Sequence, residues 1–161
     1  MHARTAMLVL AFLSGATQAQ LKPPADMTTP TTRPAPATTP AVDPVIEAKE
    51  QAAAKVAGEW LKLIDSGDYG KAWDECSTLF KEKVGRQQWV DGLPKNRAEV
   101  GAFKGRKLDG AAYRKSMPGA PEGEYVSLRF FSDFEKNPSA QEMVTLVYQD
   151  GAWRPIGYLL R

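Results

Sequence analysis

Cysteine and histidine are nearly absent from this chain of 161 residues, which contains one of each. Cys76 alone cannot form an intramolecular disulfide, so the fold must be stabilised by a packed core. Its place on an expected short helix favours a small buried apolar residue, because free cysteine is among the most buried residue types. The alternative for Cys76 is a reactive or dimer-bridging thiol.

Long apolar runs are also missing, except for one near the start of the chain. Residues 1–19 follow the pattern of a secretory signal peptide, with Arg4, an apolar run at residues 6–13 and a small-x-small sequence that ends at Ala19. The run is shorter than the roughly 20 residues that an uncleaved membrane anchor needs. We therefore expect cleavage near Ala19 and a mature protein that is periplasmic or secreted.

The one histidine, His2, lies within this expected signal peptide. The mature chain would then have no imidazole, which excludes Ser-His-Asp and Cys-His catalysis and histidine-ligated metal sites. The sequence also lacks a glycine-rich phosphate loop, an acidic calcium loop and a cysteine cluster. We expect no metal site and no cofactor.

An excess of charge of one sign is missing as well. The formal net charge is +2, and removal of Arg4 with the signal peptide lowers it to +1. Such a balance gives no general attraction for nucleic acid. The small basic run of Lys104, Arg106 and Lys107 alternates between the two faces of an expected strand, so it does not form one patch. No nucleic-acid partner is expected.

Large apolar side chains are scarce in residues 20–43, which are rich in proline and threonine. This segment cannot bury enough surface to offset the entropy of ordering it. We expect a disordered, semi-extended spacer. The alternatives are a ligand segment for another protein or a site of sugar attachment to threonine. The remaining residues, 44–161, are enough for a single domain with one core.

The first half of this domain has helical periodicity. Asp43–Pro44 is a favourable helix start, and Ser66–Gly67 is a favourable stop. Between them, apolar residues recur at the helical period and form one face. That face contains Ala53, Val56, Ala57, Trp60, Leu61 and Ile64.

Two shorter helices are expected next. Asp68 caps one that extends to about Cys76, and the other covers about Arg86 to Leu93. Pro94 is expected to end or kink the latter, because its ring removes a backbone donor and clashes with the preceding turn.

The second half of the domain has the alternation of β-strands. We expect strands at about residues 103–117, with a break at Gly110, and at about residues 125–131 and 143–148. Val126, Leu128 and Phe130 would face the helices.

Asp150–Gly151 is the strongest hairpin signal in the chain. It leads into a last strand over residues 153–160, in which Pro155 indicates a bulge or an edge position. Helices followed by strands predict an α+β fold, with N-terminal helices packed on a curved four-stranded antiparallel sheet.

The helices can cover only one face of such a sheet. Apolar residues are also expected on the other face, which makes it a candidate interaction surface. We therefore expect a possible homodimer through the sheet, and sedimentation as a monomer at micromolar concentration would contradict it. The apolar residues expected on this other face are Phe131, Val147, Ile156 and Tyr158.

Five segments carry a resemblance to a known family: EWLKLIDSGDYGKAW (59–73), QQWVDGL (87–93), GRKL (105–108), PGAPEGEYVSLRF (118–130) and GAWRPIGYLL (151–160). Together they resemble the bacterial family known as domain of unknown function 4019, over residues 53–161. The resemblance implies a small exported protein with no assigned activity, and its order of elements is similar to the nuclear-transport-factor-like (cystatin-like) cone, which often leaves a pocket. Pro94 departs from the family pattern.

Aromatic residues are the main candidates for a ligand site in such a cone. They would form the wall of a pocket for a hydrophobic or cyclic ligand, or they would simply pack in the core. The candidate wall consists of Trp60, Trp73, Trp89, Tyr113, Phe130 and Trp153.

Two functions follow from these patterns. The first is an exported, non-enzymatic binding or interaction module for an unknown small molecule or protein. The alternative is a small pocket enzyme that uses Tyr and carboxylate acid–base chemistry.

No spacing selects the pair that such an enzyme would use. Tyr113 with Asp133 and Tyr158 with Asp74 are both conceivable. Arg106 and Arg129 are candidates for an anionic ligand, or for cross-strand pairs with acids such as Glu124 and Glu142.

Overall fold

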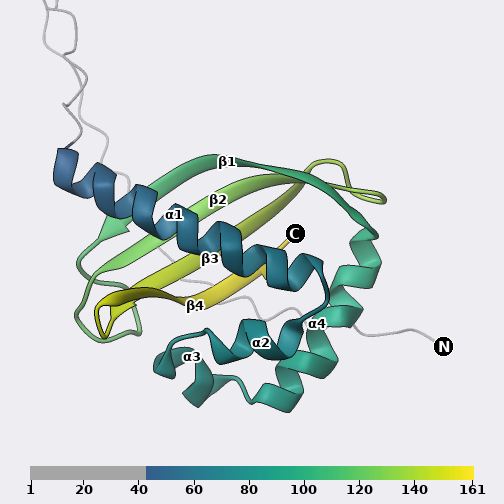
Figure 1. Cartoon of the computed structure of the whole chain (residues 1–161), viewed down its shortest axis with the longest axis horizontal. Coiled ribbons are helices and arrows are strands. Elements are labelled where there is room, and N and C mark those ends of the chain that lie inside the picture. The colour runs from purple at the N-terminus through teal and green to yellow at the C-terminus, as the bar shows by residue number, and fades with distance from the viewer. Residues whose placement is uncertain (1–42) are drawn as a thin grey trace, which may run out of the picture. The chain divides into compact units, whose positions relative to one another are not determined.

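The computed structural model describes residues 43–161, and the expected signal peptide and proline-rich spacer lie outside these residues. Within them, helices precede strands, and the strands form one antiparallel sheet (Figure 1). The expected α+β fold is therefore confirmed. The elements are α1 (Pro44–Asp65), α2 (Tyr69–Asp74), α3 (Thr78–Lys83), α4 (Arg86–Val100), β1 (Phe103–Arg114), β2 (Tyr125–Phe134), β3 (Ala140–Gln149) and β4 (Ala152–Leu160).

The long helix α1 begins and ends where the sequence predicts. The Asp43 side chain accepts a hydrogen bond from the Val45 N–H at 2.9 Å, and Pro44 occupies the first turn. Gly67, with φ of +81°, follows the last turn. Figure 1 shows α1 lying across one face of the sheet. Its expected apolar face is buried there, at Ala53, Ala57, Trp60, Leu61 and Ile64.

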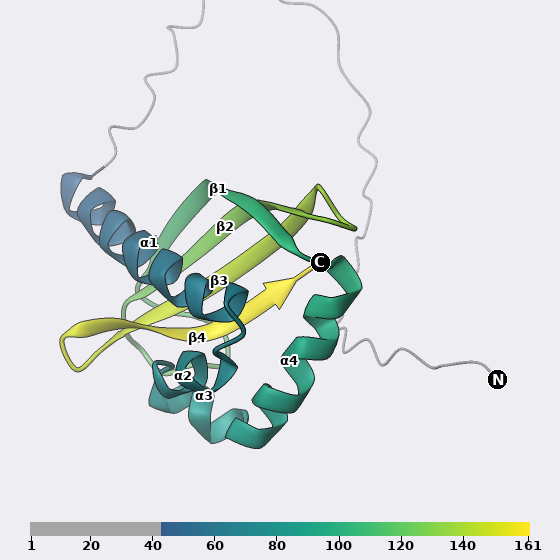
Figure 2. The ribbon, with the colours of Figure 1, turned by 45° about the vertical axis from the view of Figure 1, so that its right-hand side comes forward.

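Helices α2 and α3 lie beside the β4 edge of the sheet, and α4 extends from them past one end of the strands (Figure 2). Asp68 caps α2, as expected, and accepts a hydrogen bond from the Lys71 N–H. Helix α3 was not predicted from the sequence. The Ser77 hydroxyl caps it by accepting a hydrogen bond from the Phe80 N–H at 3.2 Å. A helix of six residues is too short to show a helical period.

Helix α4 corrects one prediction. We expected it to end near Leu93, but it continues through Pro94 to Val100. Its second half is held by Arg97, whose buried guanidinium pairs with acids on α1 and β3. These tertiary contacts offset the backbone donor that Pro94 removes.

The sheet has the strand order β1-β2-β3-β4. The register of β1 against β2 shifts between Leu108 and Gly110, which confirms an irregularity where a break was expected. The register of β4 shifts opposite Leu146, next to Pro155, and β4 is an edge strand. Asp150 and Gly151 both have positive φ, at 52° and 80°, as a two-residue hairpin of type I′ requires.

The core lies between α1 and the sheet. Val126, Leu128 and Phe130 face it from β2, as predicted, and Trp60 packs against them from α1. Tyr158 also faces this core, where its ring centroid lies 5.7 Å from that of Trp60.

Tyr158 was expected on the opposite face of the sheet, and that prediction was wrong. The register shift beside Pro155 places Tyr158 opposite Val144, which points toward the helices. On the outer face, Val147 is buried opposite Tyr125, whereas Phe131 is exposed. The expected homodimer would therefore have a smaller apolar surface than the sequence predicts.

Candidate functional site

A buried group of charges joins α1, α4, β1 and β3, and we call it the central ion cluster. It contains Asp65, Arg97, Arg106 and Glu142. Arg97 donates to Asp65 at 2.6 Å and to Glu142 at 3.2 Å. Arg106 donates to Asp65 at 2.8 Å and, through its Nε, to Glu142 at 2.7 Å. Two positive and two negative charges neutralise each other in this cluster.

Two hydroxyl groups complete the coordination of Glu142. Tyr158 donates to Glu142 Oε1 at 2.5 Å, and Ser132 donates to Oε2 at 2.5 Å. Burial, followed by the negative charge of Glu142, raises the pKa of Tyr158 well above its usual value. The phenol therefore stays protonated, and each carboxylate oxygen of Glu142 already accepts hydrogen bonds.

Both guanidinium groups stay charged in this setting. Burial alone would lower the pKa of Arg106, but its hydrogen bond to Asp65 and the charge of Glu142 outweigh burial and raise it. The same balance raises the pKa of Arg97, where Tyr158 and Asp65 outweigh burial. The charged groups of the cluster are thus partnered by one another, and these pairs connect α1, α4, β1 and β3.

The structure separates the acid–base pairs that the sequence left open. Tyr158 contacts Glu142, whereas Asp74 pairs with Arg86 on the surface at 3.2 Å. Tyr113 on β1 and Asp133 on β2 lie at opposite ends of the paired strands, because Tyr113 is opposite Val126 and Asp133 is opposite Gly105.

The two strand arginines have different partners. Arg106 pairs with Glu142, one of the two acids that the sequence offered, and also with Asp65. Arg129 instead pairs with Asp109 at 2.5 Å.

Cys76 is buried, as the sequence favours, and its Sγ donates to the Ala72 carbonyl at 3.3 Å. Burial raises the pKa of the thiol to about 12. At neutral pH the thiolate, which is the reactive form, is therefore suppressed.

This shift predicts a loss of stability at alkaline pH. An unfolded thiol ionises near pH 8.5 to 9, so from about pH 9 to 12 the unfolded state loses a proton that the folded state keeps. The contribution of Cys76 is fully present below this range and is lost as pH rises through it. We expect Cys76→Ala to flatten the decline by up to about 1.4 kcal/mol per pH unit in urea unfolding at pH 8 to 11. Equal slopes in both proteins would contradict this expectation.

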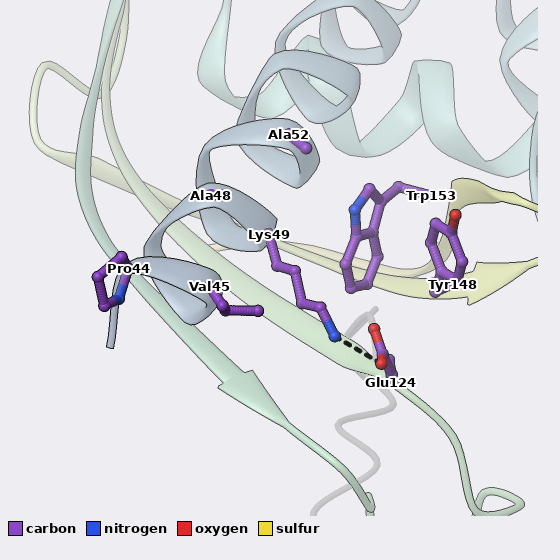
Figure 3. Close-up of a pocket in the computed structure, with 8 residues that line it drawn as sticks. All are labelled: Pro44, Val45, Ala48, Lys49, Ala52, Glu124, Tyr148 and Trp153. Atoms are coloured by element: carbon purple, nitrogen blue, oxygen red, sulfur yellow. Dashed lines mark hydrogen bonds and ion pairs between the residues drawn. The ribbon is translucent and has the colours of Figure 1, made fainter. Parts of the chain in front are cut away.

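A pocket of about 590 Å³ opens between the first turns of α1 and the β3–β4 hairpin (Figure 3), and we call it the α1–hairpin pocket. Its volume is in the range of small-molecule sites. The rings of Tyr148 and Trp153 form its aromatic wall, with centroids 5.3 Å apart in an edge-to-face arrangement. The lining residues are Pro44, Val45, Ala48, Lys49, Ala52, Glu124, Tyr148 and Trp153.

The hairpin turn explains why the two aromatic rings meet. Tyr148 and Trp153 are directly paired across the Asp150–Gly151 turn, so their side chains lie on the same face of the sheet. Tyr148 is 47% exposed, whereas Trp153 is only 7% exposed. The pocket thus has one accessible ring and one ring that is anchored in the core.

One ion pair lies at the edge of this apolar surface. Lys49 donates to Glu124 at 2.6 Å, and its Nζ lies 5.0 Å from the centroid of the Tyr113 ring. The hydrogen bond that Lys49 donates to Glu124 is the main cause that raises the pKa of Lys49, so the ammonium stays charged. Figure 3 shows the pair at the opening between α1 and the sheet.

Trp153 differs from the other tryptophans in its hydrogen bonding. Trp60, Trp73 and Trp89 each donate their indole N–H to a main-chain carbonyl, at 2.7, 2.8 and 3.0 Å. Within residues 43–161, Trp153 Nε1 donates no hydrogen bond. This nitrogen is not fully buried. In the same range, the one fully buried side-chain polar atom without a partner is Asp133 Oδ1.

Of the six aromatic residues predicted as a pocket wall, the structure places Trp153 in this pocket. Trp60, Trp89 and Phe130 belong to the core, and Tyr113 lies next to the pocket beneath Lys49. Trp73 is half-buried at the α2 end and lies under Lys81. A ligand-binding role for these residues stays a prediction.

The α1 side of the pocket and the Lys49–Glu124 pair were not predicted from the sequence. The pair joins residues 75 positions apart, which no local period reveals. Tyr148 is not one of the six predicted wall residues, although the Asp150–Gly151 hairpin signal is sufficient to pair it with Trp153.

Comparison with protein families shows to which family this chain belongs. A family model described as "Protein of unknown function (DUF4019)" matches residues 56–158. The chain belongs to the DUF4019 family. The resemblance recognised in the sequence is thereby confirmed at the level of the family. No curated protein matches the chain.

The DUF4019 match includes the whole central ion cluster, together with Glu124, Tyr148 and Trp153. The α1 side of the pocket, including Lys49, precedes the matched residues. Within residues 43–161, no helix is long and apolar enough to cross a membrane. The same part of the chain contains no group of three or more metal-ligating side chains.

Proposed function

We propose that this DUF4019 protein is an exported, non-enzymatic binding module that holds a small ligand in the α1–hairpin pocket. The observation that carries the proposal is the accessible aromatic wall of this pocket. Exposed aromatic surface next to an ion pair is typical of ligand sites, which combine apolar contact area with few polar groups. The sequence pattern of residues 1–19 supports export to the periplasm or the medium.

The central ion cluster supports a non-enzymatic function. The best Tyr–carboxylate pair in residues 43–161 is Tyr158 with Glu142, and Glu142 is 0% exposed. Its oxygens accept from two arginines and from Ser132 as well. Such a carboxylate has no free position at which to take a proton from a substrate. The alternative of a small acid–base enzyme therefore has less support than binding.

The proposal predicts that an apolar aromatic probe binds at Tyr148. We expect 1-naphthamide to bind the purified protein in a saturable manner, and Tyr148→Ala to weaken binding about 5-fold or more through loss of aromatic contact. Isothermal titration calorimetry measures both affinities.

Phe131→Ala is the matched control, because Phe131 is 45% exposed on the opposite face of the sheet. The control should bind the probe as the unmodified protein does. Equal weakening by the two variants, or no saturable binding, would contradict a binding site in this pocket.

A further inference from the structure

We infer that the ligand of the α1–hairpin pocket is a small, flat apolar molecule that carries a carboxylate. This inference rests on the proposed function and specifies the chemistry of the same site. It follows from the hydrogen-bond donors that the pocket contains, from its charges and from the shape of its walls.

The pocket contains an unused hydrogen-bond donor. Trp153 is more than nine-tenths buried, yet within residues 43–161 its indole N–H has no acceptor. Figure 3 shows the indole nitrogen on the side of the ring that faces α1. An indole can only donate, and buried tryptophans normally find an acceptor. Because this nitrogen is open to the pocket, a ligand bound there can supply the acceptor in place of water.

Lys49 is the group at the pocket that favours a negative acceptor. Pro44 and Val45, the first two residues of a 22-residue helix, also line the pocket, and the Asp43 carboxylate already accepts from the Val45 N–H at this end of the α1 dipole. Lys49 adds a full positive charge. The one carboxylate in the lining is Glu124, and it already accepts from Lys49.

Glu124 is in a position to act as the counter-ion that a ligand replaces. The side chains of Lys49 and Glu124 are 31% and 36% exposed. Ion pairs this exposed contribute little to stability, because water screens them. A carboxylate ligand can therefore pair with Lys49 while the Glu124 side chain rotates outward into the solvent.

The walls fit a flat apolar body of one or two rings. Val45, Ala48 and Ala52 form the α1 side, and Tyr148 and Trp153 form the hairpin side. Apart from Lys49 and Glu124, the lining contains no charged residue. A ring system placed between these sides would have its polar group at the edge where Lys49 lies.

Three probes with the same body test this inference by calorimetry. They are 1-naphthoate, 1-naphthamide and 1-naphthylmethylammonium, which differ in the charge of one substituent. We expect the unmodified protein to bind the carboxylate at least 3-fold more tightly than the amide, and the ammonium least tightly.

Variants of the two residues of the ion pair should change the affinity for naphthoate in opposite directions. We expect Glu124→Gln to tighten naphthoate binding about 2- to 5-fold, because the competing carboxylate is gone, and Lys49→Met to weaken it by a similar factor. We expect Trp153→Phe to weaken naphthoate and naphthamide about 2- to 10-fold and the ammonium less, since one hydrogen bond is lost. Lys62→Met, which breaks the exposed pair with Glu59 on the same helix, should change nothing.

The outcomes separate this inference from the proposed function. Equal affinities for naphthoate and the ammonium, with no effect of Glu124→Gln, would overturn the carboxylate ligand and leave the binding module standing. Because Glu124 is on the surface, this result does not depend on whether Trp153→Phe folds. Failure of all three probes to bind would instead overturn the proposed function.

Discussion

Replacement of Glu142 by glutamine is expected to lower the free energy of unfolding by about 3–5 kcal/mol. Glu142 is completely buried and accepts hydrogen bonds from Arg97, Arg106, Ser132 and Tyr158. A neutral amide keeps the shape but leaves two buried guanidinium groups with Asp65 as their one counter-ion. Removal of one partner from a buried ion pair costs far more than the pair itself contributes. Urea unfolding followed by circular dichroism measures the difference.

Glu59→Gln is the control for this experiment. Glu59 pairs with Lys62 at 2.8 Å on the exposed side of α1, and such a pair contributes about 0–1 kcal/mol. A loss for Glu142→Gln as small as that of the control would show that the cluster does not hold the fold together.

Truncation of Trp60 to alanine is expected to have a similarly large effect, about 3–5 kcal/mol. Its ring packs with Trp89 at 6.1 Å and with Tyr158 at 5.7 Å between centroids. Its indole N–H also donates to the Ala72 carbonyl at 2.7 Å, which joins α1 to α2. The variant therefore creates a cavity and leaves the buried Ala72 carbonyl with the weaker thiol donor of Cys76.

Tyr148→Ala provides the comparison, because it removes an aromatic ring that is half exposed at the pocket. We expect it to cost about 1 kcal/mol or less in the same urea unfolding experiment. Similar losses for the two variants would mean that Tyr148 belongs to the core, and the α1–hairpin pocket would lose its role as a ligand site.

Local sequence signals were sufficient for most of the fold. The caps of α1, the Asp150–Gly151 hairpin and the irregularity at Pro155 each depend on one or two residues and their backbone preferences. The extent of α4 was not predictable in this way. Pro94 favours a stop locally, and the contacts that override it are made by Arg97 with residues distant in the sequence.

The same limit applies to the candidate site. The pairs of the central ion cluster join residues such as Arg97 with Asp65 and Arg106 with Glu142, which are 32 and 36 positions apart. Lys49 and Glu124 are even further apart in the sequence, at 75 positions. A register shift of one residue also decides which face of β4 Tyr158 occupies, and the sequence indicates a bulge at Pro155 without giving its direction.

The indole N–H signals of the four tryptophans test the central claim most directly. In an amide correlation spectrum of the purified protein they are separate from the backbone signals, and the spectrum of Trp153→Phe identifies the signal of Trp153. On titration with 1-naphthoate we predict that the Trp153 signal moves and saturates, whereas those of Trp60, Trp73 and Trp89, which already donate to carbonyls, stay in place. A stationary Trp153 signal, or movement of the Trp60 and Trp89 signals instead, would contradict a binding site between α1 and the β3–β4 hairpin.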